Sequence, residues 1–418
     1  MLSAFMVPDE SWSQRPSDPT AIDQPDQEFL DVFQEGQRPL VLAHYMPWYT
    51  AKPVSGNWGW HWTMNHFDPD IENEGRREIA SKYYPLIGPY DSGDPAVIRC
   101  HLLLMKLSGI DGVIVDWYGL TEYRDYPILH RNTTRLLQQC ERLKMKFVIC
   151  YEDQTISALR SAKRLAIEAA LPHAVKEINW LGKYWFKSPS YVRFNDRPVL
   201  LSFGHEGLSP EQWSQCLTQL DQPILYYSQD YRRDGAVGSF GWPSPNAGMA
   251  QVDRFLEQAQ EWPSVVPAAF PRFDDIYAVA GVGDGYPKLP DAGGDTLAET
   301  LAKTVRKNTH FLQIATWNDW GEGTQVEPSV EFGYRDLETI QGFVNKLVPE
   351  VKTDPGSESA TPRDLRLPIK LLALRRRMEG GEVKGVDVDD LIDQIEELIV
   401  RGKQKEAWQK FRGLERLE

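Results

Sequence analysis

The stretch from Gly112 to Tyr151, GVIVDWYGLTEYRDYPILHRNTTRLLQQCERLKMKFVICY, holds one complete strand–helix–strand unit. Its two ends, 112–117 and 147–151, are short apolar runs rich in β-branched residues, which predict buried strands. Between them, residues 132–144 repeat apolar positions at helical spacing. This order predicts two parallel strands joined by a helix that covers the sheet.

The same alternation recurs outward from this unit in both directions. The predicted strands are 40–46, 112–117, 147–151, 198–203, 224–228, 237–241, 265–269 and 311–316. The predicted helices are 95–108, 132–144, 156–185, 210–220, 248–261, 296–307 and 337–348. A hairpin turn is expected at Asn195-Asp196, and Ser209 is expected to cap the helix that follows the fourth strand. Eight units without a glycine-rich phosphate-binding fingerprint favour an α/β fold of the (β/α)8 TIM barrel type over a doubly wound sheet.

Composition divides the chain into a large barrel and smaller flanking parts. We expect an irregular N-terminal lead-in, a barrel, a linker rich in Pro, Gly, Ser and Thr, and a helical C-terminal appendage, at 1–38, 39–351, 352–364 and 365–418. The appendage shows three amphipathic patterns, at 365–378, 388–401 and 404–417. No residue in it suggests chemistry, so we expect it to pack on the barrel or on a partner subunit.

Charge and cysteine usage limit the classes of partner. The chain has 60 acidic and 46 basic residues, a net charge of -14, which disfavours nucleic acid and anionic membranes but not a neutral sugar. No apolar run reaches 18 residues, and the N-terminus lacks the basic region of a signal peptide, so a cytoplasmic location is expected. The four cysteines, Cys100, Cys140, Cys150 and Cys216, lack metal-type spacing and are expected to be buried free thiols.

The predicted carboxyl ends of the strands are rich in acids, aromatic rings and amides. Catalytic residues of such barrels lie at these ends and in the loops that follow. Carboxylates transfer protons while rings and amides hold a sugar, so this composition predicts a glycan cleft. The predicted substrate-binding residues are His44, Tyr45, Trp48, Tyr49, Trp60, His61, Asp116, Trp117, Tyr118, Glu152, His205, Gln229, Trp242, Asn318 and Trp320. Any one of the tryptophans could instead be a core residue, and Asp116 could bond backbone amides.

Two acids stand three residues apart in the run WNDWGEGT, residues 317–324. Glycosidic cleavage needs one group to protonate the leaving oxygen and another to act as, or to generate, the nucleophile. Asp319 and Glu322 are the predicted catalytic pair, and Gly321 and Gly323 permit a tight backbone around them. The competing interpretation is a capping-box variant at a helix start, although tryptophan and glycine are poor helix starters.

The run 317–328, WNDWGEGTQVEP, resembles the closing motif of glycoside hydrolase family 99 and its WbsX-like relatives, which include endo-acting α-mannosidases and α-mannanases. HYMPWY at 44–49, YYP at 83–85 with GPY at 88–90, and residues 112–118 are also similar to that family, over about 39–350. The resemblance implies a retaining reaction: Asp319 deprotonates the sugar 2-hydroxyl, which attacks the anomeric carbon and gives a 1,2-anhydro intermediate. Glu322 is then the general acid and afterwards the general base.

One position departs from the family pattern, because the family has Glu where this chain has the shorter Asp319. The WNDWGE form is also similar to glycoside hydrolase family 71, the α-1,3-glucanases. The sequence therefore predicts an endo-acting, retaining α-glycoside hydrolase on α-mannan-type or related polysaccharide. The alternatives are an α-1,3-glucanase, a sugar lyase or transferase, and a non-catalytic glycan-binding or polysaccharide-assembly protein on the same barrel.

No cofactor and no metal site are expected. The histidines His44, His61, His66 and His205 could in principle bind a metal, but they lack the spacing of known ligand motifs. The expected partner is an oligosaccharide or polysaccharide substrate, with no nucleic acid and no membrane; the sequence leaves the oligomeric state open.

Overall fold

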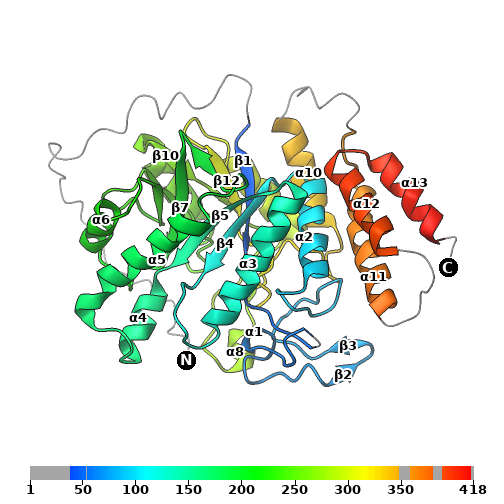
Figure 1. Cartoon of the computed structure of the whole chain (residues 1–418), viewed down its shortest axis with the longest axis horizontal. Coiled ribbons are helices and arrows are strands. Elements are labelled where there is room, and N and C mark those ends of the chain that lie inside the picture. The colour runs from blue at the N-terminus through cyan, green and yellow to red at the C-terminus, as the bar shows by residue number, and fades with distance from the viewer. Residues whose placement is uncertain (1–37, 53, 348–357, 380–387, 416–418) are drawn as a thin grey trace.

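The computed structural model describes residues 38–52, 54–347, 358–379 and 388–415 (Figure 1). The predicted lead-in up to residue 37 and residues 352–357 of the predicted linker lie outside the described part.

A parallel sheet curls into a nearly closed barrel, which confirms the predicted fold class. Its strands are hydrogen-bonded in the order β10, β9, β8, β7, β5, β4, β1, β12 and β11. They span, in chain order, β1 Leu40–Tyr45, β4 Gly112–Trp117, β5 Lys146–Glu152, β7 Arg197–Phe203, β8 Leu225–Gln229, β9 Gly238–Phe240, β10 Ser264–Val266, β11 Ala268–Ala269 and β12 Phe311–Ile314. All eight predicted strands are present.

The predicted seventh strand is interrupted at Pro267, which separates β10 from β11. Proline has no backbone N–H to donate to a neighbouring strand. The first piece, β10, pairs with β9, and the second, β11, pairs with β12. The two pieces together therefore connect the ends of the barrel between β9 and β12.

Helices cover the outer face of the barrel (Figure 1). They are α2 Pro95–Leu107, α3 Tyr126–Leu143, α4 Gln154–Ser161, α5 Ala170–Tyr184, α6 Pro210–Thr218, α7 Met249–Gln258, α9 Asp295–Lys303 and α10 Arg335–Leu347, with the short 3₁₀ helices η2 Ile167–Ala169, η3 Ala259–Glu261 and η4 Ala292–Gly294. Ser209 caps α6, as predicted, and it does so in a full capping box with Gln212. The expected turn at Asn195-Asp196 joins the short antiparallel strand β6, Arg193–Phe194, to β7, with left-handed φ values of 47° and 59°.

Two predicted helices differ from the structure. The single helix expected over 156–185 is divided into α4 and α5, because Lys163 adopts a left-handed φ of 57° that a right-handed helix cannot continue through. Helix α3 begins at Tyr126 rather than at residue 132, with a proline in its first turn, where the missing N–H costs nothing.

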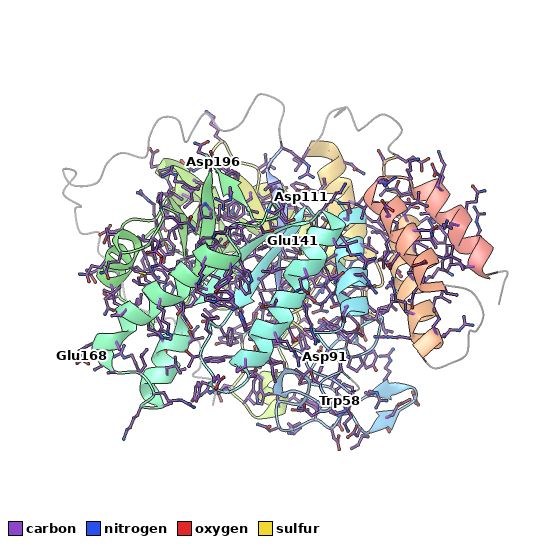
Figure 2. The ribbon with its side chains drawn as sticks, in the orientation of Figure 1. Trp58, Asp91, Asp111, Glu141, Glu168 and Asp196 are labelled. Carbon is purple, nitrogen blue, oxygen red and sulfur yellow. The ribbon has the colours of Figure 1, made fainter. Side chains whose placement is uncertain are left out.

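The carboxyl ends of the barrel strands lie together at one end of the molecule. Asp111 and Asp196, which precede β4 and β7, lie at the opposite end from Trp58 and Asp91, which follow β1 (Figure 2). The long connection after β1 carries helix α1 Trp60–Thr63 and strands β2 Glu72–Asn73 and β3 Arg76–Arg77 at this end, and the connection after β11 carries α8 Tyr277–Ala280 (Figure 1). These long loops form the end at which a barrel of this type holds its site.

Three C-terminal helices pack beside α2 and α10 (Figure 1). They are α11 Leu367–Glu379, preceded by η5 Asp364–Arg366, then α12 Val388–Val400 and α13 Gln404–Glu415. Glu396 of α12 is only 1% exposed and lies 2.5 Å from Arg375 of α11 and 3.6 Å from Arg99 of α2. A buried ion cluster thus joins this appendage to the barrel. None of the described helices is both long and apolar enough to span a membrane.

Candidate active site

The predicted acid pair lies on a tight turn directly after β12. The backbone N–H of Glu322 donates to Oδ1 of Asp319 at 3.0 Å, and the N–H of Asp319 donates to Oγ1 of Thr316 at 2.8 Å. Residues 320–323 form a turn and not a helix. The capping contact that a structural interpretation predicted is therefore present, but it links the two acids to each other.

The neighbouring loop fixes this turn through the backbone. Asp274 N–H donates to the carbonyl of Glu322 at 2.8 Å, and Ile276 N–H donates to that of Gly321 at 3.0 Å. Gly323 has a φ of +69°, and a Cβ there would lie 2.6 Å from the carbonyl oxygen of Asp274. Only glycine permits both this conformation and this close approach. The position of Glu322 is thus set by two loops that meet only in the folded chain.

Burial separates the proton affinities of the two acids. Asp319 is 5% and Glu322 7% exposed. Burial raises the pKa of Asp319 to about 6, although hydrogen bonds from the backbone of Glu322 and Gly321 lower it. The pKa of Glu322 is raised well above its usual range by burial and then by the charges of Asp319 and Asp275. Near neutral pH this difference favours a carboxylate at Asp319 and a protonated acid at Glu322.

Two further acids extend the pair across the strand ends. Asp116 is the last residue but one of β4, and Glu152 is the last residue of β5. Burial and the charge of Asp319 raise the pKa of Asp116, while burial and the charge of Asp116 raise that of Glu152. Oδ1 of Asp116 and Oε2 of Glu322 have no hydrogen-bond partner among the described residues. The site therefore holds a buried row of acids with unused oxygens, which we name the acid row: Glu322, Asp319, Asp116 and Glu152.

Aromatic hydroxyls flank the acid row. The backbone N–H of Trp320 donates to the hydroxyl of Tyr49 at 3.0 Å. Burial first, and then Asp319, raise the pKa of Tyr49; Tyr277 is affected in the same way by burial, Glu322 and Asp319. Burial first, and then the charges of Asp116 and Glu152, raise the pKa of Tyr118. Tyr49 and Tyr118 thus lie beside the acids, and their contact with substrate stays a prediction.

Sequence reasoning missed Tyr277 and Asp275. They lie in the long loop after β11, where the sequence predicts no site residue. Arg272 is fully buried against Asp336, and Asp274 pairs with Lys82 and Lys288, so both are structural. The usable signal was the length of the loop itself, because long loops at this end of a barrel carry site residues.

A flat stack of rings stands beside Tyr49. Trp48 and His61 are parallel, with ring centroids 4.2 Å apart and an interplanar angle of 4°. Trp60 contacts His61 edge-on. Burial lowers the pKa of His61 to about 3, so the ring is neutral and its 3.8 Å approach to Asp125 is not an ion pair at neutral pH. Trp48, Trp60 and His61 thus adjoin the acids through Tyr49, as a group suited to the apolar face of a sugar.

His44 and Trp242 form a second ring pair, with centroids 4.8 Å apart in an edge-on arrangement. His44 also contacts Gln313, and burial lowers its pKa to about 4. Gln229 and His205 lie on the β7 and β8 side, where Gln229 accepts from the Gly204 N–H and His205 accepts from Arg233. None of these four has a described contact with the acid row, so their substrate contacts remain predictions.

The structure corrects two strand positions. Side chains alternate across a strand, so Asp116 and Trp117 face opposite ways. Trp117 is fully buried against Trp180 of α5 and Trp185, which directly follows α5. Tyr45 is likewise fully buried and bonds His101 of α2 at 3.1 Å. Both face the helix layer rather than the acid row, so the expected substrate contact is wrong for them.

The structure also corrects Asn318 and Trp320, which are both fully buried. The Asn318 side chain accepts from the backbone of Met46 at 2.8 Å and donates back to it at 3.0 Å. The Trp320 ring N–H donates to Glu327 at 3.2 Å. These two residues hold the acid turn against β1 and its loop, and they position the catalytic candidates instead of contacting substrate.

Among the residues that the structure describes, no group of three or more His, Cys, Asp or Glu side chains is arranged to hold a metal ion. All four cysteines are buried free thiols. What the arrangement offers is a pair of acids with separated proton affinities, further protonated acids and stacked rings at the carboxyl end of a barrel. This fold and this site define a glycoside hydrolase.

The particular family follows from comparison with known proteins. The model of glycosyl hydrolase family 99 matches residues 38–228. The glycoprotein endo-alpha-1,2-mannosidase of Rattus norvegicus is 34% identical over 339 residues, which cover 70% of this chain and 68% of that protein. The glycoprotein endo-alpha-1,2-mannosidase-like protein of Homo sapiens is 34% identical over 342 residues, which cover 69% of this chain and 68% of that protein. The chain belongs to glycosyl hydrolase family 99.

A solved structure shares the fold. The GH99 endo-alpha-mannosidase of Bacteroides thetaiotaomicron superposes with a TM-score of 0.58 at 16% identity, covering 73% of this chain and 97% of that one. At that identity the likeness concerns the fold alone.

Proposed function

We propose that this glycoside hydrolase cleaves α-mannosidic bonds inside mannose-type glycans, with retention of anomeric configuration. The relatives named as endo-alpha-1,2-mannosidases support the sugar and the endo mode. The observation that carries the proposal is the acid turn, where Asp319 and Glu322 are hydrogen-bonded through the backbone and differ in proton affinity.

In the proposed reaction Asp319 takes the proton of the sugar 2-hydroxyl, and that oxygen attacks the anomeric carbon. The bond to the leaving oxygen breaks as Glu322 gives that oxygen its proton. A water then opens the 1,2-anhydro sugar: Glu322 takes a proton from the water, and Asp319 returns its proton to the 2-oxygen. The raised pKa of Glu322 suits the acid, and that of about 6 for Asp319 suits the base at neutral pH. The raised pKa values of Asp116 and Glu152 favour their protonated forms, which can donate to sugar oxygens.

The decisive experiment measures product release by the purified full chain from α-mannan fragments and from α-1,3-glucan fragments. Glu322→Gln keeps the side-chain shape but has no proton to transfer, so turnover should fall by about 10²–10⁴-fold. Glu257→Gln, on the exposed face of α7, is the matched control and should keep full activity. Unchanged turnover in Glu322→Gln removes the proposal, and cleavage of the glucan alone would move the substrate to the other sugar. NMR of the first product anomer tests retention.

A further inference from the structure

A hollow lined by basic residues lies beside the loops after β5 and β7. Its volume is about 710 Å³, within the range of small-ligand sites. Its lining includes Arg160 and Ser157 of α4, Lys163 and Arg164 after it, and Glu206 after β7. Glu168, in the 3₁₀ helix η2, marks the outer edge of this region of the molecule (Figure 2). In a chain of net charge -14, three cations against one acid make this hollow a local exception.

Arg160 is built into the hollow without a partner for its charge. Its side chain forms no hydrogen bond and no ion pair with any residue that the structure describes, and its Nε is shielded from solvent without an acceptor. A shielded donor without a partner is costly, and a guanidinium prefers the paired oxygens of a carboxylate or phosphate. An anionic group bound in the hollow would give the guanidinium a partner for its charge.

A second basic contact brings another loop to the same place. The guanidinium groups of Arg124 and Arg164 lie 5.0 and 5.2 Å from the ring of Tyr123. Neither side chain has an ion-pair partner among the residues described in the structure, and both are exposed. The two cations therefore share one ring, and their fields add over a distance shorter than the screening length of about 8–10 Å.

A series of ring contacts leads from Arg164, in the lining of the hollow, to the acid row. Tyr123 contacts Tyr126 at 5.6 Å, and Tyr126 contacts Tyr118 at 5.3 Å, where Tyr118 adjoins Asp116 and Glu152. Along the chain, Arg160 is six residues into α4, about 9 Å from its start after β5. A glycan bound across the acids can thus reach the hollow with its outer units, and the 64% exposed Ile167 offers an apolar contact for a sugar ring.

We propose that this hollow binds an anionic substituent, a carboxylate or a phosphate ester, on a glycan whose scissile bond lies at the acid row. The inference rests on the proposed function and specifies its substrate class: an acidic glycan held by charge at one end and cleaved at the other. Arg160, Lys163 and Arg164 supply the charge, and Glu206 can accept from a neighbouring hydroxyl.

The first test detects the anion directly and needs no hydrolysis. The full chain labelled with ¹⁵N-arginine is titrated with inorganic phosphate, with glucuronate and with neutral methyl α-mannoside, and the Arg160 Nε–Hε signal is assigned by its loss in Arg160→Gln. We expect a saturable shift with phosphate, glucuronate or both, and none with the mannoside. Tighter binding of phosphate would indicate a phosphate ester as the natural substituent, and tighter binding of glucuronate a uronic acid. No shift with either anion overturns the proposal.

The second test measures cleavage of α-linked oligosaccharides of equal length with and without an acidic substituent. Arg160→Gln, Lys163→Gln and Arg164→Gln together should raise KM for the acidic substrate about tenfold, leaving kcat and the neutral substrate unchanged. Lys176→Gln, Lys183→Gln and Lys187→Gln, on or just after α5, remove the same charge and should change neither. Equal effects of both triple variants overturn the inference alone. A wild-type chain that cleaves no substrate but passes the titration overturns the proposed function and leaves the anion site.

Discussion

The backbone N–H of Glu322 and the carboxylate Oδ1 of Asp319 are hydrogen-bonded at 3.0 Å, so the base and the acid of the proposed reaction share one turn. One contact thereby lowers the pKa of Asp319 and sets the distance between the two groups. The short side chain of Asp319 is suited to this role, because Asp can accept hydrogen bonds from backbone N–H groups a few residues further on.

This dual role predicts different effects of two substitutions at one position. Asp319→Asn retains an oxygen that can accept from Glu322 but cannot act as a base, so activity should fall by about 10²–10⁴-fold with little loss of stability. Asp319→Ala should lose the same activity and in addition about 1 kcal/mol of folding free energy. Urea unfolding and turnover measured on both variants check this; equal stability of the two would contradict the capping role.

The pH dependence of kcat/KM should show an acid limb near pH 6. The pKa of Asp319 is about 6, so below that pH it is protonated and the rate should fall about tenfold per pH unit. Burial and the charges of Asp319 and Asp275 raise the pKa of Glu322 well above its usual range, so the alkaline limb should lie at higher pH than the acid limb. A profile from pH 4 to 9 on a neutral glycan measures both limbs. Activity that stays constant down to pH 4.5 would exclude Asp319 as the base.

Asp116 should cost stability as pH rises above the usual pKa of an aspartate. Its folded pKa is raised above the unfolded value by burial and by Asp319, so the folded chain holds the proton longer and stability falls as pH rises between the two values. Asp116→Asn removes this cost and should raise Tm more at pH 8 than at pH 4, while reducing activity. Circular dichroism melts at the two pH values decide it. A Tm gain that is the same at both would show that the charge is not responsible.

Two tryptophans next to strand ends should behave in opposite ways. Trp117 is fully buried against the helix layer, so Trp117→Leu should lower the free energy of unfolding by about 3 kcal/mol without changing KM. Trp48 stacks on His61 beside the acids, so Trp48→Leu should raise KM with a smaller loss of stability. Thermal melts and kinetics of the two variants form matched controls for each other. A raised KM in Trp117→Leu would restore it as a substrate contact.

The ion cluster under the appendage should be essential for its docking. Glu396→Gln removes the carboxylate that the half-buried Arg99 shares with the buried Arg375. Arg375 keeps Asp393 at 2.8 Å, so the change should cost about 1–3 kcal/mol. Glu397→Gln, whose carboxylate lies on the exposed side of α12, should cost well under 1 kcal/mol. Chemical denaturation of both variants measures the difference. Similar losses would show that the cluster contributes no more than a surface pair.

The sequence alone determined the barrel, its eight strands and the acid pair, because these depend on local patterns. Alternating apolar runs and helical spacing are readable in a linear chain, and Asp319 and Glu322 are adjacent in it. The sequence could not tell which way a strand-end ring would face, since alternation fixes opposite faces but not which of them is the interior; Tyr45 and Trp117 proved to face the helices. It placed Asp116 and Glu152 at the same end of the barrel as the acid turn, but it could not show that Asp116 adjoins Asp319. It did not reveal Tyr277 or the approach of Arg124 to Arg164. Those contacts link loops far apart in the chain, and only the closing of the barrel brings them close enough for burial and mutual charge to change their proton affinities.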